Sequence, residues 1–553
     1  MIKSKYFKVS ALLLLAGIAG CTKLNESYTT TVPINQAVES LGPQFPGLLL
    51  TAAYNDIPSP FVGQDQVFSL EENSTDESLV PTRGGDWDDN GVWRVVHNHT
   101  WNADHSQVLS VYNNLNKLNF DATNVLQFNP SPGQKAEARF LRALSLYFLL
   151  DIYGQFPFRN PGDNLLLAPK VYTGDSAVQF IISELNAAMP DLDPSNGPTR
   201  ANQDAAKVLL MRLYLNRGAF INRATPTFDD ADMTQVITLG QQIMGGKYSY
   251  MANYFDNFSS SNGSSSEAIF AYPASSGVSA NNPGMDGRWM MTFHYNEYDA
   301  QAPNAGWNGF STISDFYNAF GVNGTATTFK PADTALDSRL GGRVNSNLQT
   351  TLASGIRPGF LVGQQHDQNG VALKDRKGNP LAFDPNIAAN MIETGSNLEV
   401  TGIRVAKYVP DFSDPSGKFY SSNPGNWLML MRYPEVALMV AEAKMRSTSA
   451  QDNAGALKIV NDLRKARGAA PLTSMTLVNA GSLNNGPGDP NTLLAERGRE
   501  LYWESLRRTD LIRFGVFLVT WQYKPSDDPK YLLFPVPNQA LAVNPNLKQN
   551  PGY

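Results

Sequence analysis

The stretch SPGQKAEARFLRALSLYFLLDIYG, residues 131–154, predicts a long helix with one buried face. Ser131 can cap its N-terminus with Gln134 in the capping-box position, and Pro132 suits the first helical turn. Apolar side chains recur every four residues, at Phe140, Leu144, Phe148 and Ile152. Gly154 is expected to end the helix, because glycine readily adopts the left-handed conformation of a C-terminal cap.

Further helices are expected on the C-terminal side of this stretch. NQDAAKVLLMRLYLNRG, residues 202–218, is predicted to end at Gly218. Residues 433–447 and 454–468 are separated by a short break that fits an antiparallel helical hairpin, and residues 492–515 form another helix. These helices look like tetratricopeptide-style pairs without a fixed period. The sequence therefore predicts a mainly α-helical scaffold.

A large insertion from about residue 250 to 430 interrupts this scaffold. It is rich in Gly, Asn, Ser and Asp and has few periodic apolar runs, which predicts loops joined to short strands. Asn369-Gly370 and Gly378-Asn379 are candidate hairpin turns. Loops of this extent in a compact protein are usually functional.

Composition excludes some classes of function. The chain has 553 residues, of which 42% are apolar and 17% charged, with a net charge of −6 and a pI near 5.5. No Lys/Arg run is present, so nucleic acid is not an expected partner. The one cysteine, Cys21, rules out an intramolecular disulfide and a CxxC motif.

The N-terminus has the pattern of an export signal. Lys3, Lys5 and Lys8 precede a short apolar run, residues 11–18, which is too short to span a bilayer. Residues 18–21, Ile-Ala-Gly-Cys, resemble a lipobox, in which Cys21 becomes the first mature residue and carries the lipid. The alternative is an ordinary signal peptide with an incidental cysteine. We favour the lipoprotein, because the only cysteine stands where the lipobox requires it.

Catalytic signatures are scarce. There is no P-loop, no HExxH and no GxSxG. Glu496, Glu500 and Glu504 share a helical face, but arginines interleave with them and Glu504 can pair with Arg508 four residues on. A structural salt-bridge network is therefore favoured over a catalytic carboxylate pair, which needs an acid in a cleft.

His97, His99 and His105 could hold zinc. The sequence offers neither a definite fourth ligand nor a helical i,i+4 arrangement. Packed or hydrogen-bonded histidines are therefore the favoured interpretation, with no metal and no cofactor.

Two segments combine aromatic side chains with Gly, Asn, Asp and Arg. PTRGGDWDDNGVWRVVHNHTW, residues 81–101, contains Trp87, Trp93 and Trp101. The second, GRWMMTFHYNEYDAQAPNAGWNGF, residues 287–310, contains Trp289, Phe293, Tyr295, Tyr298 and Trp307. A sugar offers apolar C–H faces and hydroxyls, so it is bound by flat rings beside polar side chains. The alternative is that these rings anchor a loop region with little regular core.

Several segments together resemble the SusD/RagB family of outer-membrane nutrient-binding lipoproteins. They are the lipobox at Cys21, TRGGDWDDNGVW, AEARFLRALSLYFLLDIYGQFPF, NWLMLMRYPEVALMVAEAKMRS, AERGRELYWESLRRTDLIRFG and LFPVPNQALAVNPNLKQNPGY. The resemblance implies a SusD-like fold, in which four tetratricopeptide-like helix pairs support a loop-rich region with short strands. It implies a signal peptide at 1–20 and one domain at 21–553, with an N-terminal part at about 22–230 and a C-terminal part at about 265–553.

The resemblance also implies binding without turnover. The expected role is capture of a glycan at the cell exterior and its delivery to a SusC-like TonB-dependent transporter in the outer membrane, with the lipid-anchored protein as a lid. A glycoside hydrolase using acids such as Asp86 and Glu77, and a peptide-capturing relative, are the alternatives.

Candidate ligand-binding residues follow from their positions in matching segments. Trp87, Trp289 and Trp307 are the expected stacking platforms. The expected hydrogen-bonding partners are Arg83, Asp86, Asp88, Asn308 and Arg357. Cys21 is the lipidation site, and no catalytic residue is assigned.

Overall fold

The computed structural model describes residues 34–275, 284–297, 306–320, 337–341, 358–365, 371–395, 398–408, 425–478, 491–525 and 527–553. Residues 1–20, Cys21 and Arg357, on which predictions fall, lie outside them. Within the described residues the chain is mainly helical with short strands, which confirms the predicted fold class. No helix of this part combines the length and the apolar character needed to cross a bilayer.

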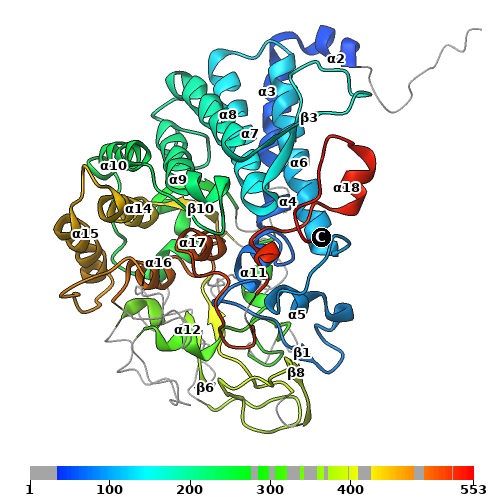
Figure 1. Cartoon of the computed structure of the whole chain (residues 1–553). Helices are drawn as coiled ribbons and strands as arrows, with labels where there is room; N and C mark the ends of the chain where they lie inside the picture. The colour runs from blue at the N-terminus through cyan, green and yellow to red at the C-terminus, as the bar shows by residue number, and fades with distance from the viewer. Residues whose placement is uncertain are drawn as a thin grey trace, which may run out of the picture.

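The scaffold is built from helices that pack in succession along the chain (Figure 1). Each packs against the next in the order α3 Phe45–Asn55, α6 Ser106–Gln127, α7 Pro132–Tyr153, α8 Gly174–Ala188, α9 Gln203–Ile221, α10 Asp230–Met244, α14 Tyr433–Arg446 and α15 Asn453–Ala466. Among the described residues, these eight successive helices are the number that four helix pairs would contain. One apolar core cluster runs through them from Leu50 to Leu547.

The capping prediction for α7 is confirmed. The Ser131 hydroxyl accepts from the backbone N–H of Gln134, the Gln134 side chain accepts from the N–H of Ser131, and Gly154 ends the helix at φ 69°. The predicted hairpin is also present as α14 and α15. Local sequence therefore supplies the caps at both ends of α7.

Gly218 does not end its helix, because α9 continues to Ile221. A Cβ at residue 218 would lie 1.7 Å from the carbonyl oxygen of Thr227. This glycine thus permits the close approach of a neighbouring segment instead of forming a C-cap.

Residues 492–515 form two helices instead of the single predicted one. They are α16 Leu493–Leu501 and α17 Arg507–Arg513. Between them Trp503 and Ser505 take left-handed backbone conformations, at φ 59° and 61°. Glu504 consequently pairs with Lys407 and Arg432 and not with Arg508, so the predicted i,i+4 pair is absent.

The remaining helices are short: α2 Ile34–Leu41, α4 Pro58–Phe61, α5 Val92–His97, α11 Gly287–Met290, α12 Ser314–Asn318 and α18 Asn538–Val543. The strands of the described part form two-stranded sheets. β1 Thr82–Arg83 pairs in parallel with β8 Ile392–Glu393. The antiparallel pairs are β2 Gln155–Phe158 with β3 Lys170–Thr173, β4 Ala268–Tyr272 with β10 Leu428–Arg432, β5 Gly359–Leu361 with β9 Arg404–Ala406, and β6 Gly363–Gln364 with β7 Ala382–Phe383.

A buried ionic cluster joins the insertion to the scaffold. Arg467, the C-cap residue of α15, contacts Glu267 and Glu500 at 2.7 and 2.8 Å, and Arg432 of β10 contacts the same two carboxylates. Arg339 from the insertion reaches Glu500 at 3.2 Å. The predicted structural network is therefore present, and these carboxylates lie in the protein interior and not in a cleft.

Candidate ligand-binding site

Residues 81–101 contain β1, α5 and the turn that joins them, at the loop-rich end of the molecule (Figure 1). Trp87, Asp89 and Asn90 have positive φ values of 60°, 38° and 58°. Left-handed backbone is unfavourable for residues with a Cβ, and such strain gathers at functional sites. The turn is therefore held in its shape by contacts outside the segment.

The Trp87 indole provides these contacts. Its Nε1 donates to the backbone oxygen of Trp307 at 2.7 Å. The ring meets Trp93 and Phe310 edge to face, with centroids 5.2 and 5.4 Å apart. It also covers Gly309, where a Cβ would lie 2.3 Å from the ring. These contacts fix the half-buried Trp87 ring and tie the 81–101 turn to the second aromatic segment.

Trp307 is the exposed ring of this surface. Its backbone N–H donates to Met290 of α11 at 2.7 Å, and the residue is 36% exposed. An anchored backbone beneath an exposed indole gives a flat apolar face at a small entropic cost. Such a face suits the C–H side of a sugar ring.

A chain of polar contacts starts at Asp86, the neighbour of Trp87 in the sequence. The Tyr295 hydroxyl donates to the exposed carboxylate of Asp86. The Arg376 guanidinium lies 3.7 Å from the Tyr295 ring centroid, and its Nε donates to Glu399 at 2.8 Å. Burial, followed by the interaction with Asp86, raises the pKa of Tyr295 to about 12, so its hydroxyl remains protonated at neutral pH. We call Trp87, Trp307, Asp86, Tyr295 and Arg376 the tryptophan site.

Asp88 lies at the edge of the same turn. Its carboxylate accepts from Arg94 at 3.1 Å and from the Thr82 hydroxyl at 3.4 Å. These bonds hold the turn. Because the Asp88 side chain is only half buried, part of its carboxylate still faces solvent.

Three predicted contact residues are buried, and this corrects their expected positions. Trp289 is 0% exposed and lies in the apolar core. Arg83 is buried and donates to the hydroxyl and the carbonyl oxygen of Thr401, each at 2.7 Å. Asn308, the residue after Trp307 in the sequence, is also buried. The Arg83 side chain therefore supports the loops, whereas both polar atoms of the Asn308 amide are buried with no hydrogen-bond partner in the described structure.

Sequence reasoning did not select Tyr295 and Arg376 as ligand contacts. Tyr295 was noticed among the aromatics of the second segment, and Arg376 lies in the predicted Gly378-Asn379 turn. That turn is confirmed by backbone bonds between Asp375 and Asn379. The Arg-Lys pair in its Asp-Arg-Lys-Gly-Asn sequence could have indicated an exposed basic turn. The residues that this turn contacts depend on tertiary structure.

The three histidines of the 97–105 stretch make separate interactions. His97 contacts backbone oxygens of Asn73, Ser78 and Gln522. His99 bonds to the Asp527 carboxylate, and His105 to the carbonyl oxygen of Val92. Across the described ranges no group of three or more His, Cys, Asp or Glu side chains is placed to hold a metal ion.

The acids considered for hydrolysis do not share a surface. Glu77 is buried and accepts from the Trp503 backbone N–H at 3.1 Å, whereas Asp86 is exposed. Burial raises the pKa of Glu77 to about 8. Because Glu77 acts as an acceptor inside the core, it is not placed to act with Asp86 across a substrate.

Comparison with known proteins agrees with this architecture. The SusD family model matches residues 266–531. The starch-binding protein SusD of Bacteroides thetaiotaomicron is 24% identical over 507 residues, which cover 88% of this chain and 85% of that protein. The chain is similar to the SusD/RagB family, as the sequence resemblance predicted.

Solved structures share the fold. A SusD superfamily protein from Parabacteroides distasonis superposes with a TM-score of 0.65 at 18% identity, over 92% of this chain and 99% of that one. Surface glycan-binding protein A from Bacteroides thetaiotaomicron, solved with laminarihexaose, gives 0.62 at 16% identity over the same shares. At such identities the likeness defines the fold, and the ligand must be argued from the site.

Proposed function

We propose that this chain binds a glycan at the tryptophan site and does not cleave it. The observation that carries the proposal is the exposed Trp307 indole, whose backbone oxygen accepts from the Trp87 side chain. Asp86, Tyr295 and Arg376 form a chain of polar contacts that starts next to Trp87. A sugar ring can stack on the indole while its hydroxyls meet the carboxylate and guanidinium. Relatives named for starch and laminarihexaose binding support this class of ligand.

The cellular part of the proposal rests on the N-terminal sequence and the family likeness. Residues 1–20 are removed on export, and Cys21 carries the lipid that anchors the protein to the outer membrane, facing the cell exterior. From there the protein passes its glycan to a SusC-like TonB-dependent transporter. Radiolabelled palmitate should enter the wild type and not Cys21→Ser, and the transporter should co-purify from solubilised outer membranes.

The binding test begins with affinity gels containing plant, fungal and microbial polysaccharides. Against the polysaccharide that retards the wild type, Trp307→Ala should weaken binding at least about tenfold, because the stacking face is lost. Trp307→Phe should keep part of the affinity, since a smaller ring remains. Calorimetry with oligosaccharides of the same polysaccharide measures the change.

Leu48→Ala removes a side chain that is similarly exposed but lies on the helical scaffold, and it should bind as the wild type does. Unchanged affinity in a folded Trp307→Ala protein would refute the tryptophan site. Release of reducing sugar from the bound polysaccharide would instead indicate a hydrolase. Saturable binding of peptide mixtures with no glycan binding would indicate a peptide-capturing protein.

A further inference from the structure

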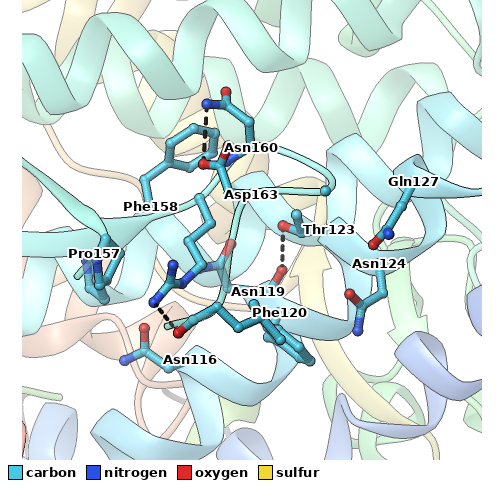
Figure 2. A pocket seen from close by; sticks show the side chains of 14 residues that line it. Asn116, Asn119, Phe120, Thr123, Asn124, Gln127, Pro157, Phe158, Asn160 and Asp163 are labelled. Carbon is cyan, nitrogen blue, oxygen red and sulfur yellow. Dashed lines mark hydrogen bonds between the residues drawn. The ribbon is translucent and has the colours of Figure 1, made fainter. Parts of the chain in front are cut away.

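A cavity lies on the helical scaffold, between α6 and the loop that joins β2 to β3 (Figure 2). Its volume is about 320 Å³, within the size range of small-ligand pockets. The C-terminal half of α6 and the β2–β3 loop, which line the cavity, lie on the helical part of the molecule (Figure 1). The β1 and α5 region that contains the tryptophan site lies near the other end of α6. No part of the proposed function uses this cavity.

One wall is a polar stripe on α6. Asn116, Phe120, Asn124 and Gln127 follow one another at steps of four, four and three residues, so they share a helical face. The side chains of this stripe lie along the same side of the cavity in Figure 2. Phe120 stands among the amides with 42% of its surface exposed. Its ring therefore offers an apolar face to the cavity beside the polar amides.

The opposite wall is the β2–β3 loop, whose charges are already used to shape it. The Asp163 carboxylate accepts from the backbone and side-chain N–H groups of Asn160, at 2.7 and 3.3 Å. Arg159 donates to the backbone oxygens of Asn164 and Leu165. The charges of Arg159 and Asp163 therefore sum to zero, and both side chains already make hydrogen bonds within the loop.

The amides of the α6 wall are left with unused hydrogen-bonding capacity. Asn119 lines the cavity and is only 8% exposed, yet its Oδ1 is buried without a hydrogen-bond partner in the described structure. Such an atom costs free energy unless something bonds to it. The Asn124 and Gln127 amides likewise bond to none of the described residues. A ligand with hydroxyl groups would satisfy these atoms.

We propose that this cavity is a second glycan site, which takes a neutral oligosaccharide with one ring on Phe120 and its hydroxyls on the α6 amides. The inference rests on the proposed glycan-binding function and adds a second point of contact. Each carboxamide offers both a donor and an acceptor, which matches a hydroxyl better than a charged group does. A long polysaccharide that reaches both sites would be held with higher effective affinity than either site provides.

The test uses a fluorescent reporter at the cavity rim. Cys21 is the chain's one cysteine, so the mature chain with Cys21→Ser and Leu166→Cys can be labelled at a single thiol. Leu166 is 93% exposed and follows Leu165, which lines the cavity. The probes are neutral hexasaccharides of glucose, mannose, galactose and xylose, an oligogalacturonate as the charged probe, and a peptide mixture. The same label at Lys458→Cys on α15 controls for effects elsewhere.

We expect a saturable response at Leu166→Cys to at least one neutral hexasaccharide and none at Lys458→Cys. Phe120→Ala and Asn124→Leu should each weaken that response about tenfold. Asn113→Leu, an exposed asparagine of the same helix that does not line the cavity, should leave it unchanged. Trp307→Ala should also leave it unchanged, because the two sites bind independently.

The inference is overturned if no neutral hexasaccharide elicits the fluorescence response, including the case in which only the peptide mixture or the oligogalacturonate elicits it. It is also overturned if the Phe120 and Asn124 variants respond like the wild type. If polysaccharide retention still depends on Trp307 in those cases, the proposed function stands and only the second site fails. If retention depends on Phe120 and not on Trp307, the tryptophan site fails and the cavity stands.

Discussion

Gly309 lies beneath the Trp87 indole, where an added Cβ would come within 2.3 Å of the ring. Gly309→Ala should therefore displace the indole and break its bond to the Trp307 carbonyl oxygen. We expect a loss of about 1–3 kcal/mol in the free energy of unfolding, together with weaker glycan binding. Urea denaturation and calorimetry measure the two effects.

Gly85→Ala is the matched control in the same turn, because a Cβ there meets nothing within 4 Å and the backbone φ is not positive. This variant should keep both stability and affinity. Equal behaviour of the two alanine variants would contradict the role given to Gly309.

Also at the residue scale, the sequence did not distinguish the buried Trp289 from the exposed Trp307. Both stand among Gly, Asn and Arg, and both were expected to stack on a ligand. Trp289 is 0% exposed and Trp307 is 36% exposed. α11 is a single turn, Gly287–Met290, too short for a periodic pattern that could separate an inner from an outer face. Burial here is decided by elements far away in sequence.

Among the elements, α7 and α15 were predictable because their N-terminal caps lie next to their own residues. α14 was predictable from its apolar residues, although its first backbone N–H bonds to the distant carbonyl oxygen of Glu267. The break between α16 and α17 was not predictable. The Trp503 N–H donates to Glu77 and the Ser505 N–H to Glu72, each more than 400 residues earlier in the chain. These carboxylates satisfy backbone groups that a continuous helix would have paired internally.

Glu77 also makes this break sensitive to pH. Burial raises its pKa to about 8 from a usual value near 4.5, and burial together with Glu77 raises the pKa of neighbouring Glu72. A raised carboxyl pKa means that the folded protein holds a proton that the unfolded chain releases. The stability contributed by protonated Glu77 is therefore lost as pH rises from about 4.5 to about 8.

Glu77→Gln has no proton to lose at this position. We expect its free energy of unfolding to gain on the wild type steadily between pH 5 and 8, and the difference to level off above that range. Urea titrations at several pH values measure the difference. Exposed Glu39→Gln should run parallel to the wild type, and a Glu77→Gln curve that also ran parallel would refute this account.

For the whole molecule, the buried ionic cluster sets how firmly the insertion is held to the scaffold. Arg467→Met would leave Glu267 and Glu500 with fewer cationic partners inside the protein. Removing one partner of a buried ion pair typically costs about 3–5 kcal/mol. The denaturation midpoint should fall accordingly, and the far-UV spectrum before unfolding should stay helical.

Lys458→Met breaks the exposed pair with Asp462 on the same helix, α15. Exposed pairs of this kind contribute about 0.3–0.5 kcal/mol, so this control should unfold close to the wild type. Similar midpoints for both variants would mean that the cluster does not hold the insertion in place.

For the whole molecule, periodicity and family resemblance were enough to predict the mainly helical class. They did not predict which residues form the tryptophan site. That site joins residues 86–87, 295, 307 and 376, which no local pattern connects. Composition showed that residues 81–101 and 287–310 were unusual. Only the packing of these two segments against each other and against the 371–395 loops decides which side chains face outward.

The ionic cluster has a consequence for how the chain folds. Its members are separated by up to 233 residues, from Glu267 to Glu500, so their pairing closes very long loops. Loop closure of this length is slow, and buried charges left without partners disfavour compact intermediates. We expect the scaffold helices to assemble early and the insertion to dock last, in a step that conservative changes at Arg432 or Arg467 would slow.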